Sequence, residues 1–131
     1  MNKQSMQDMV EEFMVEGKQD LDADFEPNLF NFRMTLIAEE FKELAEAAAD
    51  LTINAGDNPE ELEVRKEHVL KELCDCMYVL TGLASTFGWP VATAFDRVHE
   101  SNMTKLPFQK TDDGKIMKGP NYEPCDLGGL V

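Results

Sequence analysis

The chain has few bases, few cysteines and no long apolar run, and each shortage excludes a class of protein. Its 131 residues include 12 Lys and Arg against 26 Asp and Glu, a net charge of −14. Such a charge repels nucleic acid and anionic membranes, so we expect neither as a partner. There are three cysteines, which is an odd number. The side chains of Cys74 and Cys76 would point in different directions from a helix, so these two are expected to form neither a disulfide nor a zinc site.

Length and charge distribution also limit the organisation. Residues 1–131 are expected to form a single domain, with a core at about 29–105 and an irregular tail at 106–131 on the substrate side. Residues 1–90 carry 20 acids and 7 bases, whereas residues 91–131 carry 6 acids and 5 bases. The nearly neutral end could therefore supply lysines to a polyanion. The absence of a visible signal or membrane-length segment predicts a cytoplasmic protein.

Apolar residues at helical spacing predict an all-α fold. Helices are expected at about residues 4–16, 29–55, 59–87 and 90–102, each ended by a glycine or begun by a proline, and a short hairpin is possible near 108–118. We expect apolar stripes along the second and third helices, which include Phe41 and Leu80, to form the core of a four-helix bundle. A helical domain of this size often covers remaining apolar surface by association, so we expect a homodimer or homotetramer.

Two carboxylate pairs stand out on the two long helices: Glu40 with Glu43, and Glu72 with Asp75. Residues three apart share one face of a helix, so each pair can direct its oxygens to one point. Both pairs are expected to border an apolar stripe, where four like charges would be costly without a cation. Hard oxygen ligands favour magnesium or manganese. A single Glu-x-x-Glu would more simply be a solvated helix face; the second pair favours metal.

The same segments resemble a known superfamily. Leu36-Ile37-Ala38-Glu39-Glu40-Phe41-Lys42-Glu43-Leu44 and Lys71-Glu72-Leu73-Cys74-Asp75 resemble the Glu-x-x-Glu and Glu-x-x-Asp signature of the all-α nucleoside triphosphate pyrophosphohydrolases. This superfamily includes MazG, dimeric dUTPases and phosphoribosyl-ATP pyrophosphohydrolase. The Ser101-Asn102-Met103-Thr104-Lys105 segment and the tail to Tyr122 look like the MazG-like proteins of phages and bacteria. The resemblance covers roughly residues 29–126.

The resemblance implies a metal-dependent (d)NTP pyrophosphohydrolase. Such an enzyme cleaves the α–β phosphate linkage to release a nucleoside monophosphate and pyrophosphate, for nucleotide-pool adjustment or house-cleaning. It further implies that Glu40, Glu43, Glu72 and Asp75 hold Mg²⁺ or Mn²⁺, with two or more ions per site. The substrate is then a nucleoside triphosphate, with dGTP the first candidate, and a phage-encoded chain would act in the host cytoplasm.

Other site residues are assigned with an alternative beside each. Glu39 is the candidate to orient or deprotonate the attacking water, or else it is a solvated acid. Asn102 and Lys105 are candidates for ribose and phosphate contacts, and Lys118 for a phosphate contact, although a lysine is often only a surface charge. Arg33 is either a phosphate ligand or a salt-bridge partner. The nucleobase preference cannot be predicted from these residues.

Two functions of other classes remain open at this stage. A di-iron carboxylate protein also uses paired acids on facing helices, but it normally needs two Glu-x-x-His elements, and this chain has none. A non-catalytic acidic interaction domain would need neither the metal nor the segment from Asn102 to Lys105.

Overall fold

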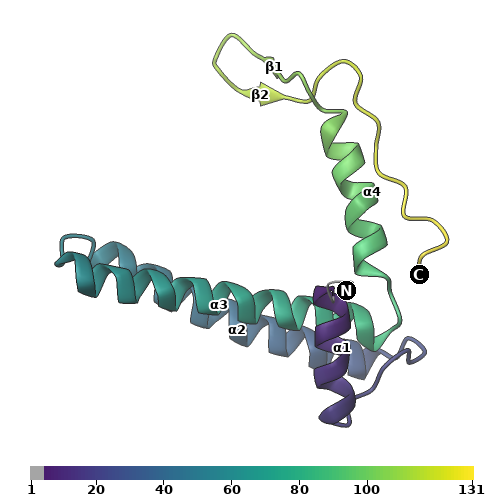
Figure 1. The fold of residues 1–131 in the computed structure, drawn as a ribbon. Helices are drawn as coiled ribbons and strands as arrows, with labels where there is room; N and C mark the ends of the chain where they lie inside the picture. The colour runs from purple at the N-terminus through teal and green to yellow at the C-terminus, as the bar shows by residue number, and fades with distance from the viewer. Residues whose placement is uncertain (1–4) are drawn as a thin grey trace, which may run out of the picture. The chain divides into compact units, whose positions relative to one another are not determined.

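The computed structural model describes residues 5–131, and in this range it contains four helices and one small hairpin (Figure 1). The helices are α1 (Met6–Glu16), α2 (Pro27–Ile53), α3 (Pro59–Thr86) and α4 (Val91–Met103). Strands β1 (Gln109–Lys110) and β2 (Ile116–Met117) pair antiparallel. The all-α prediction is confirmed, and the hairpin falls where it was expected. The predicted start of the first helix at residue 4 lies outside the described residues.

The helix starts follow from side-chain capping. Ser5 and Asp8 form a reciprocal capping box at α1. The carboxylate of Glu26 accepts from two backbone amides at the start of α2, and Pro27 follows it. The side chain of Asn58 accepts from the amide of Glu61 at the start of α3. Glu26 explains why α2 begins two residues earlier than predicted.

Contacts divide the chain into two compact units, Met1–Gly88 and Trp89–Val131. The expectation of a single domain over 1–131 is not tested by this division and stays a prediction. No helix among residues 5–131 is both long enough and apolar enough to cross a membrane.

In the first unit, α2 and α3 lie side by side as a long antiparallel pair, and α1 packs against the C-terminal part of α3 (Figure 1). Ser85 connects α3 to α1, because its Oγ accepts from Gln7 and donates to Glu11, each at 3.0 Å. Met14 of α1 is fully buried at this junction. Gly82 leaves room on α3 for the guanidinium of Arg33 and for the side chain of Met14.

The surface buried between α2 and α3 is narrower than the predicted apolar stripes. Phe41, expected in the core, is 65% exposed, and Leu80 is 52% exposed. Glu72, expected at the border of its stripe, is instead only 4% exposed. Two helices can bury only one strip of each other, and here that strip includes Glu72 and Ala47. The apolar flanks therefore remain uncovered in a single chain.

In the second unit, the tail follows α4, and side chains of α4 hold it by hydrogen bonds to the tail's backbone. Ser101 Oγ donates to the carbonyl of Glu123 at 2.7 Å, and the amide of Glu123 donates to Thr104 Oγ1 at 2.8 Å. Arg97 donates to the carbonyls of Asp126 and Gly128. The predicted irregular tail is thus ordered by contacts with its own helix.

Candidate metal centre

Three of the four predicted ligands meet between α2 and α3. Glu40, Glu43 and Glu72 each offer a carboxylate oxygen, and these oxygens all lie within 4.8 Å of one another. Glu40 and Glu43 are one turn apart on α2, whereas Glu72 approaches from α3. The antiparallel pair therefore brings together groups that are about 30 residues apart in the chain.

Two carboxylate oxygens of these residues are buried without a protein partner. Oε2 of Glu40 and Oε2 of Glu72 are shielded from solvent and accept no hydrogen bond from residues 5–131. Buried polar atoms are nearly always satisfied, because leaving one unpaired costs roughly 1–3 kcal/mol and more for a charged group. A cation bound between the helices would satisfy both atoms. The donor set, all hard carboxylate oxygen, fits Mg²⁺ or Mn²⁺.

The acids also perturb one another. Burial raises the pKa of Glu40 above its ordinary value, the charge of Glu43 and a hydrogen bond with its side chain raise it further, and the charges of Asp75 and Glu72 add to this. The pKa of Cys76 is raised first by its own burial and then by the same group of acids. Cys76 follows Glu72 by one turn of α3, so the two residues lie on the same side of the helix.

Asp75, the fourth predicted ligand, does not join the other three. Its Oδ2 lies 2.7 Å from Nζ of Lys71, and the same Nζ lies 3.5 Å from Oε1 of Glu72. The hydrogen bond to Asp75 is the main cause of the raised pKa of Lys71. His68 adds a second basic group, with Nε2 at 3.2 Å from Oε1 of Glu72. A pocket of about 360 Å³ lies beside this group, lined by Glu43, Glu46, Ala47, Asp50, His68 and Glu72.

The other two predicted site residues of α2 have contrasting environments. The side chain of Glu39 is exposed and makes no hydrogen bond or ion pair within the described part of the chain. Arg33 is only 5% exposed, and its Nη2 donates to Oε1 of Gln19 at 2.8 Å. Burial lowers the pKa of Arg33, while the charge of Asp20 opposes that effect. Nε of Arg33 is buried without a hydrogen-bond partner among residues 5–131.

Comparison with known families agrees with this arrangement. The sequence model of the phosphoribosyl-ATP pyrophosphohydrolase family matches residues 7–102. The chain belongs to this family. The family lies within the MazG-like all-α NTP pyrophosphatase superfamily, so the resemblance is confirmed at that level, and the protein is a nucleotide pyrophosphohydrolase in general terms. A search of curated proteins gave no significant match.

Some of the predicted substrate-binding residues lie beyond the range that matches the phosphoribosyl-ATP pyrophosphohydrolase family. Asn102 is the last matched residue, whereas Lys105 and Lys118 follow it. Nζ of Lys118 lies 4.2 Å from the ring centroid of Tyr122, and Nζ of Lys105 lies 5.9 Å from the same centroid. The second unit thus gathers two ammonium groups around one aromatic ring. Asn102 is exposed on the last turn of α4.

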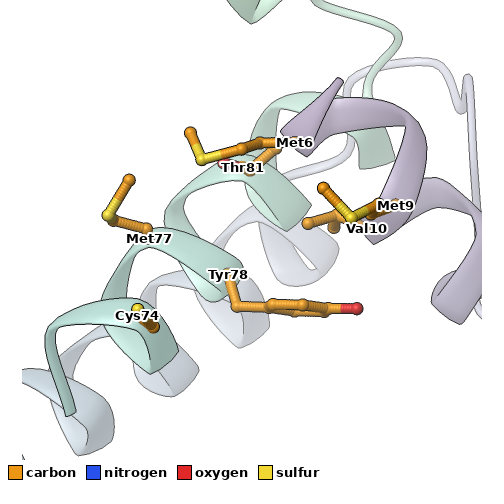
Figure 2. Close-up of a pocket in the computed structure, with 7 residues that line it drawn as sticks. All are labelled: Met6, Met9, Val10, Cys74, Met77, Tyr78 and Thr81. Atoms are coloured by element: carbon orange, nitrogen blue, oxygen red, sulfur yellow. The ribbon is translucent and has the colours of Figure 1, made fainter. Parts of the chain in front are cut away.

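The family member also has an apolar pocket of about 150 Å³ between α1 and α3. Figure 2 shows its lining: Met6, Met9, Val10, Cys74, Met77, Tyr78 and Thr81. At about 100° per residue, the α3 members of this lining lie on the side of the helix opposite to Glu72. The pocket is therefore separate from the acidic centre and offers no cluster of ligands.

Sequence reasoning assigned no role to Lys71 or Cys76. Both were visible as neighbours of the acidic motif, because Lys71 precedes Asp75 by one turn and Cys76 follows Glu72 by one turn. The missing signal was the buried side of α3. Glu72 faces α2, and Cys76, four residues later on the same side of α3, therefore faces α2 as well.

Proposed function

We propose that this protein is a metal-dependent (d)NTP pyrophosphohydrolase that cleaves the α–β linkage and releases a nucleoside monophosphate and pyrophosphate. Glu40, Glu43, Glu72 and Asp75 would hold Mg²⁺ or Mn²⁺, with two or more ions per site. The observation that carries the proposal is the pair of buried carboxylate oxygens, on Glu40 and Glu72, that find no partner in the described protein. Family membership supports the reaction class.

The chemistry divides between the metal and the chain. Bound divalent ions supply charge neutralisation at the phosphates and a lower pKa for a coordinated water. Glu39 is exposed one residue before Glu40, so its carboxylate is free to orient or deprotonate that water. Glu43 is also exposed, which leaves the α2 side of the centre accessible to solvent and substrate.

Substrate phosphates would be held by basic side chains. Lys105 and Lys118 already approach one ring, that of Tyr122, and their two positive charges suit a polyphosphate. Asn102 would contact the ribose. The role of Arg33 in substrate binding stays a prediction. Its guanidinium is buried and donates a hydrogen bond to Gln19. Replacing Lys105 by Ala should raise KM for the triphosphate more than it lowers kcat, whereas Lys66→Ala on exposed α3 surface should change neither.

The substrate is proposed to be a deoxynucleoside triphosphate, with dGTP tested first and a role in nucleotide-pool adjustment. The name of the matched family makes phosphoribosyl-ATP the specific competitor. A panel of deoxy and ribo triphosphates together with phosphoribosyl-ATP, assayed for pyrophosphate and monophosphate products, separates them. Preference for phosphoribosyl-ATP would overturn the triphosphate assignment and leave the pyrophosphohydrolase assignment intact.

The ligand assignment is tested with isosteric variants. Glu40→Gln, Glu72→Gln and Asp75→Asn should each reduce pyrophosphate release strongly and remove the rise in melting temperature that Mn²⁺ gives the parent protein. An ion at a hundred times its dissociation constant adds about 2.7 kcal/mol of stability. Glu63→Gln is the matched control, because Glu63 is exposed on the opposite side of α3. Undiminished turnover in the three variants would contradict the assignment.

The same measurements address the two other classes. A di-iron carboxylate protein predicts iron after aerobic purification and a visible absorption band. A non-catalytic acidic domain predicts that no divalent ion changes the melting temperature. Neither has a positive observation in its favour, whereas the hydrolase has the family match.

We also propose that the protein is a homodimer or homotetramer. The side chains of Leu70, Leu73, Met77 and Leu80 follow helical spacing along one side of α3, and each is at least 43% exposed. A second copy would cover this stripe. Leu73→Glu combined with Leu80→Glu should lower the sedimenting mass, whereas Val64→Glu, exposed on another side of α3, should not. An unchanged mass in the double variant would place the interface elsewhere.

A further inference from the structure

Lys71 places an ammonium group at the edge of the acidic centre. Its Nζ is 2.7 Å from Oδ2 of Asp75 and 3.5 Å from Oε1 of Glu72. The side chain of Lys71 is 66% exposed, that of Asp75 is 34% exposed and that of Glu72 is 6% exposed. One largely exposed ammonium therefore contacts both a buried carboxylate and a partly exposed one.

Asp75, which Lys71 contacts, is also the one predicted ligand that lies apart from the other three acids. The oxygens of Glu40, Glu43 and Glu72 share one small region, and the carboxylate of Asp75 is outside it. Lys71 and Asp75 are four residues apart on α3, so the ion pair holds the carboxylate along its own helix. This pairing competes with the use of Asp75 as a metal ligand together with the acids of α2.

We propose that Lys71 is a built-in counter-cation of the acidic centre, which pairs with Asp75 and Glu72 while no metal is bound and is displaced into solvent when a divalent ion binds. Asp75 then becomes free to join Glu40, Glu43 and Glu72. This inference rests on the proposed metal-dependent function. It assigns to Lys71 a positioning role in metal binding, with no contact to the reacting atoms.

The direction of the effects follows from charge. Without metal, Lys71 offsets part of the repulsion among the acids, so its loss destabilises the fold. With metal, the ammonium competes for the same oxygens and repels the ion, so its loss strengthens binding. An exposed lysine–carboxylate pair is weak, and breaking it opposes metal binding by only about two- to fivefold. Opposite signs in the two states distinguish a competing cation from a lysine that merely stabilises α3.

The experiment uses the full chain and Mn²⁺ alone, followed by calorimetry or by the electron paramagnetic resonance signal of free Mn²⁺. Lys71→Met should bind Mn²⁺ about two- to fivefold more tightly than the parent protein and should melt at a lower temperature in EDTA. Lys71→Arg keeps the charge and should retain the parent affinity. Lys66→Met removes the same charge from an exposed position on α3 and is the matched control.

Two further outcomes separate this inference from the proposed function. Equal Mn²⁺ affinity in Lys71→Met and Lys66→Met, with the parent still binding the ion, would overturn the role of Lys71 and leave the metal site intact. A parent protein that binds no Mn²⁺ would overturn both. In the background of Asp75→Asn, the Lys71→Met substitution should lose most of its effect on affinity, because the paired carboxylate is already gone.

Discussion

Nε2 of His68 lies 3.2 Å from Oε1 of Glu72, one turn further along α3. The imidazole is about half exposed, whereas the carboxylate that it approaches is buried between the helices. His68 therefore holds one oxygen of Glu72 from the solvent side. The other oxygen, Oε2, is left without a hydrogen-bond partner in the described chain and is available to a ligand.

Removal of this imidazole should loosen the metal centre. We expect His68→Ala to weaken Mn²⁺ binding by up to about tenfold, since groups that orient a ligand carboxylate typically contribute that much or more. Calorimetric titration measures the change. His99→Ala, which removes the exposed histidine of α4, should leave the affinity unchanged. Equal affinities of the two variants would show that Glu72 is oriented by its burial alone.

The raised pKa of Glu40 predicts a pH dependence of stability. The folded state binds the proton of Glu40 more tightly than the unfolded chain does, in which the pKa of this carboxyl has its ordinary value of 4.5. The contribution of Glu40 is therefore most favourable below that value and is lost as the pH rises through the folded-state pKa. In EDTA, Glu40→Gln should melt higher than the parent protein at neutral pH, and the difference should shrink toward pH 4.5.

Saturating Mn²⁺ should reverse this order, because the parent gains a ligand that the Gln variant binds poorly. Glu63→Gln should follow the parent at every pH. A Glu40→Gln variant that is less stable than the parent in EDTA at neutral pH would mean that the acid is already compensated inside the protein.

Gly82 should be replaceable by alanine with a gain in stability. A Cβ there would lie 3.5 Å from Nη1 of Arg33 and 3.9 Å from Sδ of Met14, which are ordinary contact distances. Alanine in a helix interior is favoured over glycine by up to about 1 kcal/mol. Thermal unfolding should show the increase in Gly82→Ala. Gly88→Ala should show a decrease, because Gly88 has φ of +70° and a Cβ would lie 2.8 Å from Oδ1 of Asp22.

Gly119 should not tolerate the same change. Its amide donates to the carbonyl of Lys105 at 2.7 Å, and a Cβ would overlap the carbonyl of Pro107. Gly119→Ala should therefore displace the neighbouring Lys118 from the ring of Tyr122. Hydrogen exchange should increase around residues 105–122, and KM for the substrate should rise. Gly56→Ala, where a Cβ meets no atom within 4 Å, is the control. Unchanged exchange in Gly119→Ala would contradict the close approach.

The helices and the carboxylate pair of α2 could be predicted because their signals are local. Prolines and glycines mark the ends of the helices, and the three-residue spacing of Glu40 and Glu43 directs both to one face. The side on which α2 and α3 meet could not be predicted, because the apolar stripes are wider than the strip that two helices bury. That is why Phe41 was expected inside and Glu72 at the border, the reverse of their exposures.

The ion pair of Lys71 and the burial of Arg33 escaped prediction for a related reason. A lysine or an arginine beside acids is compatible with a solvated face, a substrate contact or an internal ion pair, and only the packed structure distinguishes these. Arg33 packs against α3 at Gly82, where a Cβ would lie 3.5 Å from its Nη1. Its Nη2 contacts an uncharged amide, that of Gln19, which charge pairing alone does not suggest.

The tail beside α4 is held almost wholly through main-chain atoms, since Ser101 and Arg97 donate to carbonyl oxygens of residues 123, 126 and 128. Every amino acid offers a carbonyl oxygen. The route of this segment can therefore persist through evolutionary drift in its side chains, while the two donors on the helix must be kept. A saturation library across residues 123–128 should accept most replacements, and one at position 97 or 101 should accept few.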